Sequence, residues 1–124
     1  MATQLETAPV SLEIPDSGRC RWLRDVFGFT DTEMAYVLGI SVETMRKWLK
    51  DEEDTHAVES VRFHRLLSLT QLAKGVIRPD RLGHWVHHAN PSLGKVVPLN
   101  LLADASGYEM VSAVVEDIRT GVPD

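Results

Sequence analysis

Between Thr30 and Lys50 the sequence has a small residue, a glycine and several apolar residues with the spacing of a helix-turn-helix. This spacing constrains the fold more than any other feature of the chain. Ala35 is small enough for a second helix to cross the first one closely. Gly39, four residues later, can adopt the positive φ that the turn requires without steric cost. The other positions are an apolar core residue, a helix cap and two inward-facing apolar residues: Ile40, Ser41, Met45 and Trp48. The sequence therefore predicts a helix-turn-helix in this segment.

Capping signals place three short helices around this motif. Thr30 and Glu33 have the spacing of a capping box, in which the Thr oxygen accepts a backbone N–H and the Glu side chain reaches back. They predict a helix over residues 31–38. A capping serine and apolar residues at helical spacing predict two more helices, over residues 42–50 and 19–27.

Two segments are predicted to lie outside the helices. Residues 1–17 lack periodicity and contain prolines, which indicates a flexible N-terminal arm. The acidic run over residues 51–54 is interpreted as a solvated linker. We therefore expect three parts: the arm, a helix-turn-helix DNA-binding region over residues 18–54, and a second helical region over residues 55–124.

Apolar periodicity predicts helices in residues 55–124 as well. The expected helices run from about Val58 to Lys74, from Pro79 to just before Pro91, around Leu99–Leu102, and from a capping box of Ser106 and Glu109 to Gly121. No segment has a convincing strand pattern. The predicted fold class is all-α, with an N-terminal helix-turn-helix bundle followed by a small helical C-terminal domain.

The helix over residues 42–50 is the predicted DNA-reading helix, because the second helix of such a motif enters the major groove. Removing the inward positions leaves these residues outward: Ser41, Val42, Glu43, Thr44, Arg46 and Lys47. Arg46 can bond bidentately to guanine, and Glu43 can accept from cytosine N4. Lys47 and Lys50 are expected at phosphates, where they position the protein without reading sequence.

The charge distribution agrees with this placement of the DNA interface. The net charge of −5 argues against a protein that coats nucleic acid non-specifically. Positive charge concentrates in residues 18–50, whereas residues 80–124 are acidic. Arg19, Arg21 and Arg24 are either a solvated face, which is the default interpretation, or further phosphate contacts.

Several classes of protein find no support in the sequence. No stretch approaches the ~20 apolar residues of a membrane span, no signal peptide is visible, and the single cysteine, Cys20, fits a reducing cytoplasm. His84 and His88 are four residues apart and could share a metal ion, but a zinc site needs further ligands. With no nucleophile–base signature and no phosphate-binding loop, we expect no enzyme, no metal and no cofactor.

The second half of the chain carries a series of short motifs in a specific order. They are Trp85-Val86, Asn90-Pro91-Ser92-Leu93-Gly94, Val97-Pro98-Leu99-Asn100-Leu101-Leu102, Gly107, Glu109, Val111 and Ile118-Arg119-Thr120-Gly121. In order and spacing they resemble the toxin-binding domain of antitoxins of the Xre/MbcA/ParS type. With the helix-turn-helix, the resemblance covers roughly residues 18–122. His87 and His88 have no counterpart in this pattern.

The resemblance implies a type II antitoxin that binds and neutralises a RES-domain toxin, an enzyme that consumes NAD. It also implies autorepression of the antitoxin's own operon. Residues 55–124 would then form the toxin-binding and dimerisation region, with the C-terminal stretch from Glu116 blocking the toxin's active site. By this analogy the contact residues are Glu116, Asp117, Arg119 and Asp124.

A homodimer is expected because one helix-turn-helix contacts only a few base pairs. Two alternatives stay open at the level of sequence. The chain could be a stand-alone dimeric helix-turn-helix repressor whose second half only dimerises it. It could instead be a toxin-neutralising protein whose helix-turn-helix is purely structural.

Overall fold

The computed structural model describes residues 11–121, and its regular elements are all helices. Its α-helices are α2 (Arg19–Phe27), α3 (Asp31–Leu38), α4 (Val42–Lys50), α5 (Val61–Ala73), α6 (Pro79–His87) and α7 (Ala105–Thr120). Three short 3-10 helices complete it: η1 (Ala57–Glu59), η2 (Pro91–Leu93) and η3 (Pro98–Leu101). Within residues 11–121 no β-strand forms, and the predicted all-α class is confirmed.

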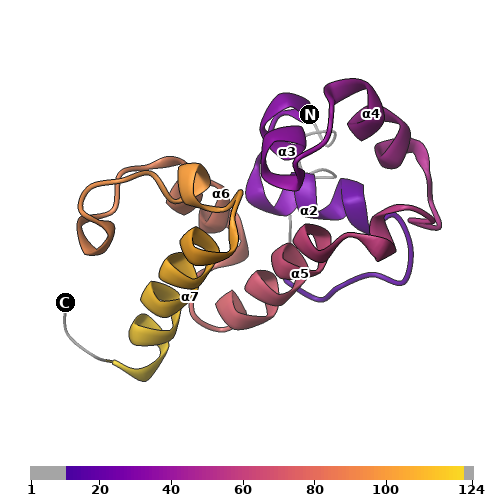
Figure 1. The fold of residues 1–124 in the computed structure, drawn as a ribbon. Coiled ribbons are helices and arrows are strands. Elements are labelled where there is room, and N and C mark those ends of the chain that lie inside the picture. Colours follow the sequence, from indigo (N-terminus) through magenta and orange to yellow (C-terminus); the bar gives the residue numbers. More distant parts are fainter. Residues whose placement is uncertain (1–10, 122–124) are drawn as a thin grey trace, which may run out of the picture.

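The helices form two groups that pack against each other (Figure 1). Figure 1 shows α2, α3 and α4 together at one end of the molecule and α6 and α7 at the other, with α5 between them. The most extensive contacts join α3 to α4 within the first group and α2 to α6 between the groups. No helix among the described residues is long and apolar enough to cross a membrane.

The two helices predicted on either side of Gly39 form at the predicted residues, as α3 and α4, and a short turn joins them. The Thr30 hydroxyl accepts from the Glu33 backbone N–H at 3.0 Å, and Glu33 accepts from the Thr30 N–H at 2.9 Å, so the capping box is complete. Gly39 adopts φ 71° at the turn, and the Ser41 hydroxyl caps α4 through the Thr44 N–H. These local signals depend on a few neighbouring residues, which is why the sequence alone reveals them.

The prediction of two inward positions on α4 is wrong at one of them. Met45 and Leu49 are the buried residues of α4, whereas Trp48 is only half-buried. Met45 and Leu49 are four residues apart and therefore share one face of the helix. The side chain of Trp48 lies about 100° around the helix from that of Leu49, at the edge of the packed face.

Residues 11–17, the described part of the predicted flexible arm, are packed onto the protein. Leu12 is 3% exposed, and its carbonyl accepts from the Gln71 side chain of α5. Glu13 forms an ion pair with Lys74. The apolar side chain of Leu12 belongs to the core, and this outweighs the lack of regular structure in the segment. Residues 1–10 of the predicted arm lie outside the described residues.

The acidic run over residues 51–54 is only in part the predicted solvated linker, because Glu52 and Glu53 are exposed whereas Asp54 caps α2. Asp54 is 1% exposed and accepts from the backbone N–H groups of Arg19 and Cys20 and from the Arg19 Nε, at 3.2–3.3 Å. The Glu52 carbonyl accepts from the Gly18 N–H at 2.7 Å. Charge alone predicts solvation, but a carboxylate at a helix N-terminus satisfies otherwise unpaired donors.

Two helix starts and one helix end also differ from the predictions. Ser60 caps α5 through the Phe63 N–H, so the helix begins after η1 and not at Val58. Asp104 caps α7 through the Gly107 N–H at 2.7 Å, in place of the predicted cap at Ser106. Helix α6 ends at His87, so Ala89 lies beyond it and is exposed. In each case the observed boundary lies only a few residues from the predicted one.

One hydrophobic core runs through the whole described chain. Its buried residues extend from Leu12 to Val115 and come from all six α-helices. Gly83 of α6 lies against the end of α2, where an added Cβ would be 3.4 Å from the Phe27 carbonyl oxygen. The predicted boundary between residues 54 and 55 therefore separates two sequence regions but not two cores.

Candidate functional site

The predicted DNA-reading face of α4 lies on the surface. Ser41, Glu43, Arg46, Lys47 and Lys50 are exposed, whereas the other two predicted contacts, Val42 and Thr44, are half-buried. The Ser41 hydroxyl is engaged with the backbone N–H and the hydroxyl of Thr44, each at 3.0 Å. The long charged side chains of the predicted set are therefore the ones most available to a ligand.

Arg46 is exposed on this face and has a carboxylate beside it. Its side chain is 62% exposed, and its Nε lies 3.7 Å from Asp31 Oδ2 at the start of α3. The other oxygen of Asp31 accepts from Arg24 Nη1 of α2 at 3.2 Å. Asp31 thus holds two guanidinium groups from different helices on one side of α4.

The C-terminal end of α4 is fixed by α2. Arg21 Nη1 donates to the carbonyl of Leu49 at 2.9 Å, and the same guanidinium forms an ion pair with Glu52. An arginine at the C-terminus of a helix satisfies unpaired carbonyls and complements the helix dipole. Together with the burial of Met45 and Leu49, these contacts give α4 a defined position on the bundle.

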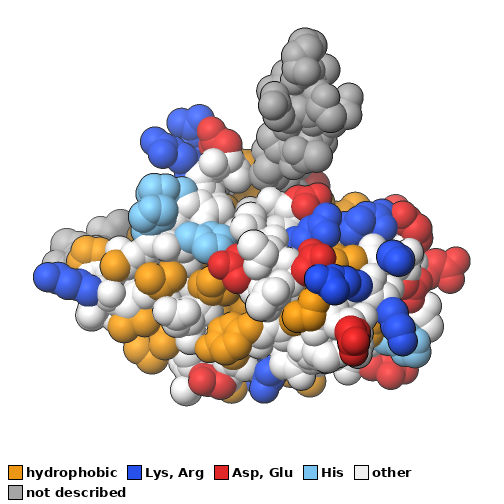
Figure 2. Space-filling model, turned by 90° about the horizontal axis from the view of Figure 1, so that it is seen from above, with side chains coloured by type: hydrophobic (Ala, Val, Ile, Leu, Met, Phe, Trp, Pro, Cys, Tyr) orange, Lys and Arg blue, Asp and Glu red, His pale blue; other side chains and the backbone are white. Residues whose placement is uncertain are grey.

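A surface hollow of about 350 Å³ lies beside α4, on the side that faces α2. Its lining combines basic residues with one acidic and one apolar side chain: Arg21, Arg24, Asp31, Arg46, Leu49 and Lys50. Figure 2 shows Lys and Arg side chains gathered, among acidic ones, over the half of the molecule formed by α2–α4. The sequence left Arg21 and Arg24 as either a solvated face or further phosphate contacts, because only the packing of α2 on α4 brings them next to Arg46.

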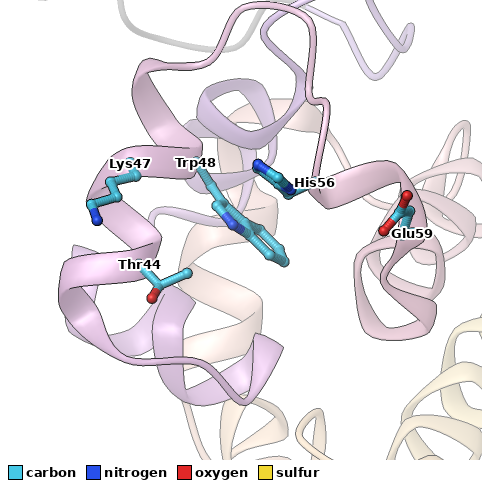
Figure 3. Close-up of a pocket in the computed structure, with 5 residues that line it drawn as sticks. All are labelled: Thr44, Lys47, Trp48, His56 and Glu59. Carbon is cyan, nitrogen blue, oxygen red and sulfur yellow. The ribbon is translucent and has the colours of Figure 1, made fainter.

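A second hollow, of about 440 Å³, lies on the opposite flank of α4. It is lined by Thr44, Lys47, Trp48, His56 and Glu59. Figure 3 shows the Trp48 indole between α4 and the η1 segment, with His56 next to it. Sequence reasoning missed this feature because it placed Trp48 in the core.

The predicted toxin-contacting residues that the structure describes lie on the last turns of α7. Asp117 and Arg119 are exposed, and Arg119 forms an ion pair with the half-buried Glu116. Asp124, the remaining predicted contact, lies outside the described residues. Two large apolar side chains of the same helix are also exposed, Met110 at 49% and Ile118 at 44%. The outer surface of α7 is therefore mixed, with charged and apolar groups.

The histidines at the end of α6 have two different arrangements. His84 and His88 stack with ring centroids 3.6 Å apart, but among residues 11–121 no group of three or more His, Cys, Asp or Glu could hold a metal ion. His87 has a different role, because its Nδ1 lies 2.7 Å from the Gly83 carbonyl and its Nε2 lies 3.0 Å from Glu33 Oε1.

The contact between His87 and Glu33 changes the pKa of both groups. Burial lowers the pKa of His87, but the hydrogen bonds to Glu33 and to the Gly83 carbonyl outweigh it and raise the pKa above the ordinary 6.5. Burial raises the pKa of Glu33, and the hydrogen bonds from His87 and Thr30 outweigh it, so that pKa falls below 4.5. The pair thus favours its ionised form and links α6 to the first turn of α3.

Cys20 is not available as a nucleophile. Its side chain is 1% exposed, and burial together with the neighbouring Asp54 carboxylate raises the pKa of its thiol to about 12. A thiol in this state is inert. Cys20 is therefore a core residue of α2, as its spacing with Leu23 and Phe27 indicates.

Comparisons with known proteins were made for both the sequence and the fold. No protein-family model matches the sequence. The "Probable mycobacterial cidal antitoxin" of Mycobacterium tuberculosis is 29% identical over 124 residues, which cover 98% of this chain and 97% of that protein. The crystal structure of the M. tuberculosis MbcT–MbcA toxin–antitoxin complex contains a chain that matches with a TM-score of 0.64 and 18% identity. This match covers 85% of the present chain and 94% of the other, and it shows a shared fold.

Proposed function

We propose that this chain, an MbcA-type antitoxin by its sequence similarity and its fold, neutralises a RES-domain toxin that degrades NAD and represses its own operon. In this proposal the C-terminal stretch from Glu116 to Asp124 blocks the toxin's active site. The reading helix is α4, and a homodimer binds the operator. The chain itself is not an enzyme and works in the cytoplasm.

The antitoxin role rests on one observation above the others: a whole-length similarity to a known antitoxin, at 29% identity over 98% of the chain. This similarity confirms the resemblance to MbcA-type antitoxins that the sequence motifs predict. The shared fold with a chain of a toxin–antitoxin complex agrees with it.

The proposed toxin contact is supported by the surface of α7. Asp117 and Arg119 are exposed near the end of that helix, and Ile118 between them is 44% exposed. Exposed apolar groups bordered by charges are typical of protein-binding surfaces. Residues 116–121 therefore have the chemistry that an insertion into a protein cleft needs.

The proposed DNA binding is supported by the geometry of the helix-turn-helix. Helix α4 is capped, anchored at its end by Arg21, and presents Arg46, Lys47 and Lys50 to solvent. The net charge of −5 places this basic surface on an otherwise acidic protein. Such a distribution suits a protein that binds DNA through one defined face.

The proposal is tested by expressing the neighbouring gene in cells, alone and together with the gene for this chain. We expect the neighbour to arrest growth and deplete NAD when expressed alone, and the chain to restore growth and co-purify with it. The variant D117A/R119A should rescue poorly, and the exposed α6 control R81A should rescue normally. A harmless or non-binding neighbour would refute the antitoxin proposal and favour a stand-alone dimeric repressor.

DNA binding is tested separately on a duplex from the region upstream of the chain's own gene. The double variant R46A/K47A should lose binding while it keeps the helical circular dichroism spectrum and the unfolding midpoint of the wild type. Unchanged binding by this variant would exclude α4 as the reading helix. A wild-type chain that rescues growth but binds no upstream DNA would have a purely structural helix-turn-helix.

A further inference from the structure

We propose that the hollow between α2 and α4 binds a phosphate of the DNA backbone, with Arg24 as its principal ligand beside Arg46 and Lys50. The inference rests on the proposed DNA binding and adds α2 as a second contacting helix. It also gives Asp31 a role, because this carboxylate holds the site ready and at the same time limits its affinity for an anion.

Basic residues from distant parts of the chain converge on this hollow. Arg24 lies near the end of α2, whereas Arg46 and Lys50 are four residues apart and lie on one face of α4. All three line the same hollow of about 350 Å³. Since Arg46 also belongs to the outward face of α4, the hollow is continuous with the predicted reading surface.

The two arginines of α2 that line the hollow make different contacts. Arg21 is already engaged, because it donates to the Leu49 carbonyl and pairs with Glu52. Arg24 pairs with Asp31 at 3.2 Å and with Asp25 at 3.3 Å, and both of these carboxylates are partly exposed. Arg21 therefore positions α4, whereas Arg24 can exchange an exposed carboxylate for a phosphate.

Positive charge predominates in the lining of the hollow. Its lining carries four basic side chains and one carboxylate, Asp31. Asp31 Oδ1 accepts from Arg24, and Asp31 Oδ2 lies 3.7 Å from the Arg46 Nε, so one carboxylate orients both guanidinium groups. A phosphate offers the same kind of oxygen acceptors and can replace it between the two arginines.

Duplex DNA is the phosphate source that this geometry favours. Backbone phosphates line the edges of the major groove, so a protein with α4 in the groove places residues flanking α4 near a strand. Contacts of this kind carry no sequence information. The proposed site should therefore strengthen binding to all duplexes equally and make binding more dependent on salt.

The test measures fluorescence anisotropy with two labelled duplexes of equal length, one from upstream of the chain's own gene and one unrelated, over a series of salt concentrations. R24Q should weaken binding to both duplexes roughly tenfold and reduce the salt-dependence slope by about 0.9. R24K, which keeps the charge, should retain the slope. D31N should strengthen binding to both duplexes, and the α6 control R81Q should match the wild type.

The outcomes separate this inference from the function on which it rests. If the wild type binds the upstream duplex and R24Q binds it with unchanged affinity and slope, the phosphate site is refuted and the DNA-binding proposal stands. If the wild type binds neither duplex, both fail. A third outcome is that the wild type binds inorganic phosphate tightly and that R24Q abolishes phosphate binding but leaves DNA binding unchanged. In that case the hollow is a free-anion site and the inference is wrong.

Discussion

At the scale of single residues, Asp54 has the largest structural role that the sequence did not indicate. It adopts φ 55° and places its carboxylate under the first turn of α2, where it accepts two backbone N–H groups and the Arg19 Nε. Asp tolerates this left-handed conformation better than most residues. One buried carboxylate thus joins the segment after α4 to the helix that precedes the motif.

The variant D54N tests this role. Asn tolerates the same backbone conformation but replaces one acceptor oxygen by an amide that faces N–H donors. We expect the free energy of unfolding at pH 7, measured by urea denaturation, to fall by about 2 kcal/mol. The exposed neighbour supplies the control E53Q, which should change it by less than about 0.5 kcal/mol. Equal effects of the two variants would show that Asp54 is not a cap.

The contact between His87 and Glu33 should make stability depend on pH. The raised pKa of His87 means that its contribution is complete below about pH 6.5 and is lost as the pH rises through the raised value. The lowered pKa of Glu33 means that its contribution is present above about pH 4.5 and is lost as the pH falls. The two conditions overlap in the mildly acidic range.

We therefore expect the difference in unfolding free energy between wild type and H87Q to be largest near pH 5.5 and to shrink towards pH 8.5. Urea denaturation at a series of pH values measures it. H88Q is the matched control, since His88 is exposed, contacts His84 of its own helix by a hydrogen bond and by ring stacking, and has no carboxylate partner among the described residues. A difference that is independent of pH would contradict the proposed ion pair.

At the scale of elements, the packing of α7 on η3 depends on a missing side chain. Gly107 lies in the first turns of α7, and a Cβ at this position would be 2.0 Å from the Leu101 carbonyl oxygen. Backbone atoms on both sides leave little room for adjustment. The close approach of α7 to η3 therefore requires glycine at residue 107.

The variant G107A should be destabilised even though alanine favours helix formation. We expect a loss of about 2–3 kcal/mol, typical of overpacking, in spite of the roughly 1 kcal/mol that alanine gains over glycine in a helix. Thermal unfolding followed by circular dichroism measures the change. The control E109A, at an exposed position of the same helix, should change the stability little. A stabilised G107A would mean that α7 and η3 do not approach this closely.

At the scale of the whole molecule, the two sequence regions depend on each other. The core is continuous from Leu12 to Val115, and α6 of the second region packs on α2 of the first. The Tyr36 hydroxyl of α3 donates to the Asn100 carbonyl at 3.3 Å, and His87 reaches Glu33. Each sequence region is therefore packed against the other over a shared core.

We therefore expect the full chain to unfold in one cooperative transition. Urea denaturation followed by tryptophan fluorescence and by circular dichroism should give coincident midpoints. Fluorescence samples both halves, because Trp22 and Trp48 lie in the first region and Trp85 in the second. A fragment of residues 55–124 should be largely unfolded, since α6 would expose the face that packs on α2. Two separate transitions, or a folded fragment, would contradict a shared core.

The local features of the fold could be predicted from the sequence alone, because they depend on near neighbours. The all-α class, the capping box of Thr30 and Glu33, the turn at Gly39 and the exposed basic residues of α4 all follow from short-range chemistry, and all are present in the structure. The order and spacing of the motifs in residues 85–121 indicated a resemblance to antitoxins.

The features that depend on residues distant in sequence could be seen only in the tertiary structure. Asp54 became a cap because α2 lies above it, Trp48 was left at an edge because Leu49 filled the core, and Arg24 met Arg46 because α2 packs beside α4. The physical reason is the same in each case. Burial and charge depend on which surfaces meet in space, and a linear pattern of residues does not contain that information.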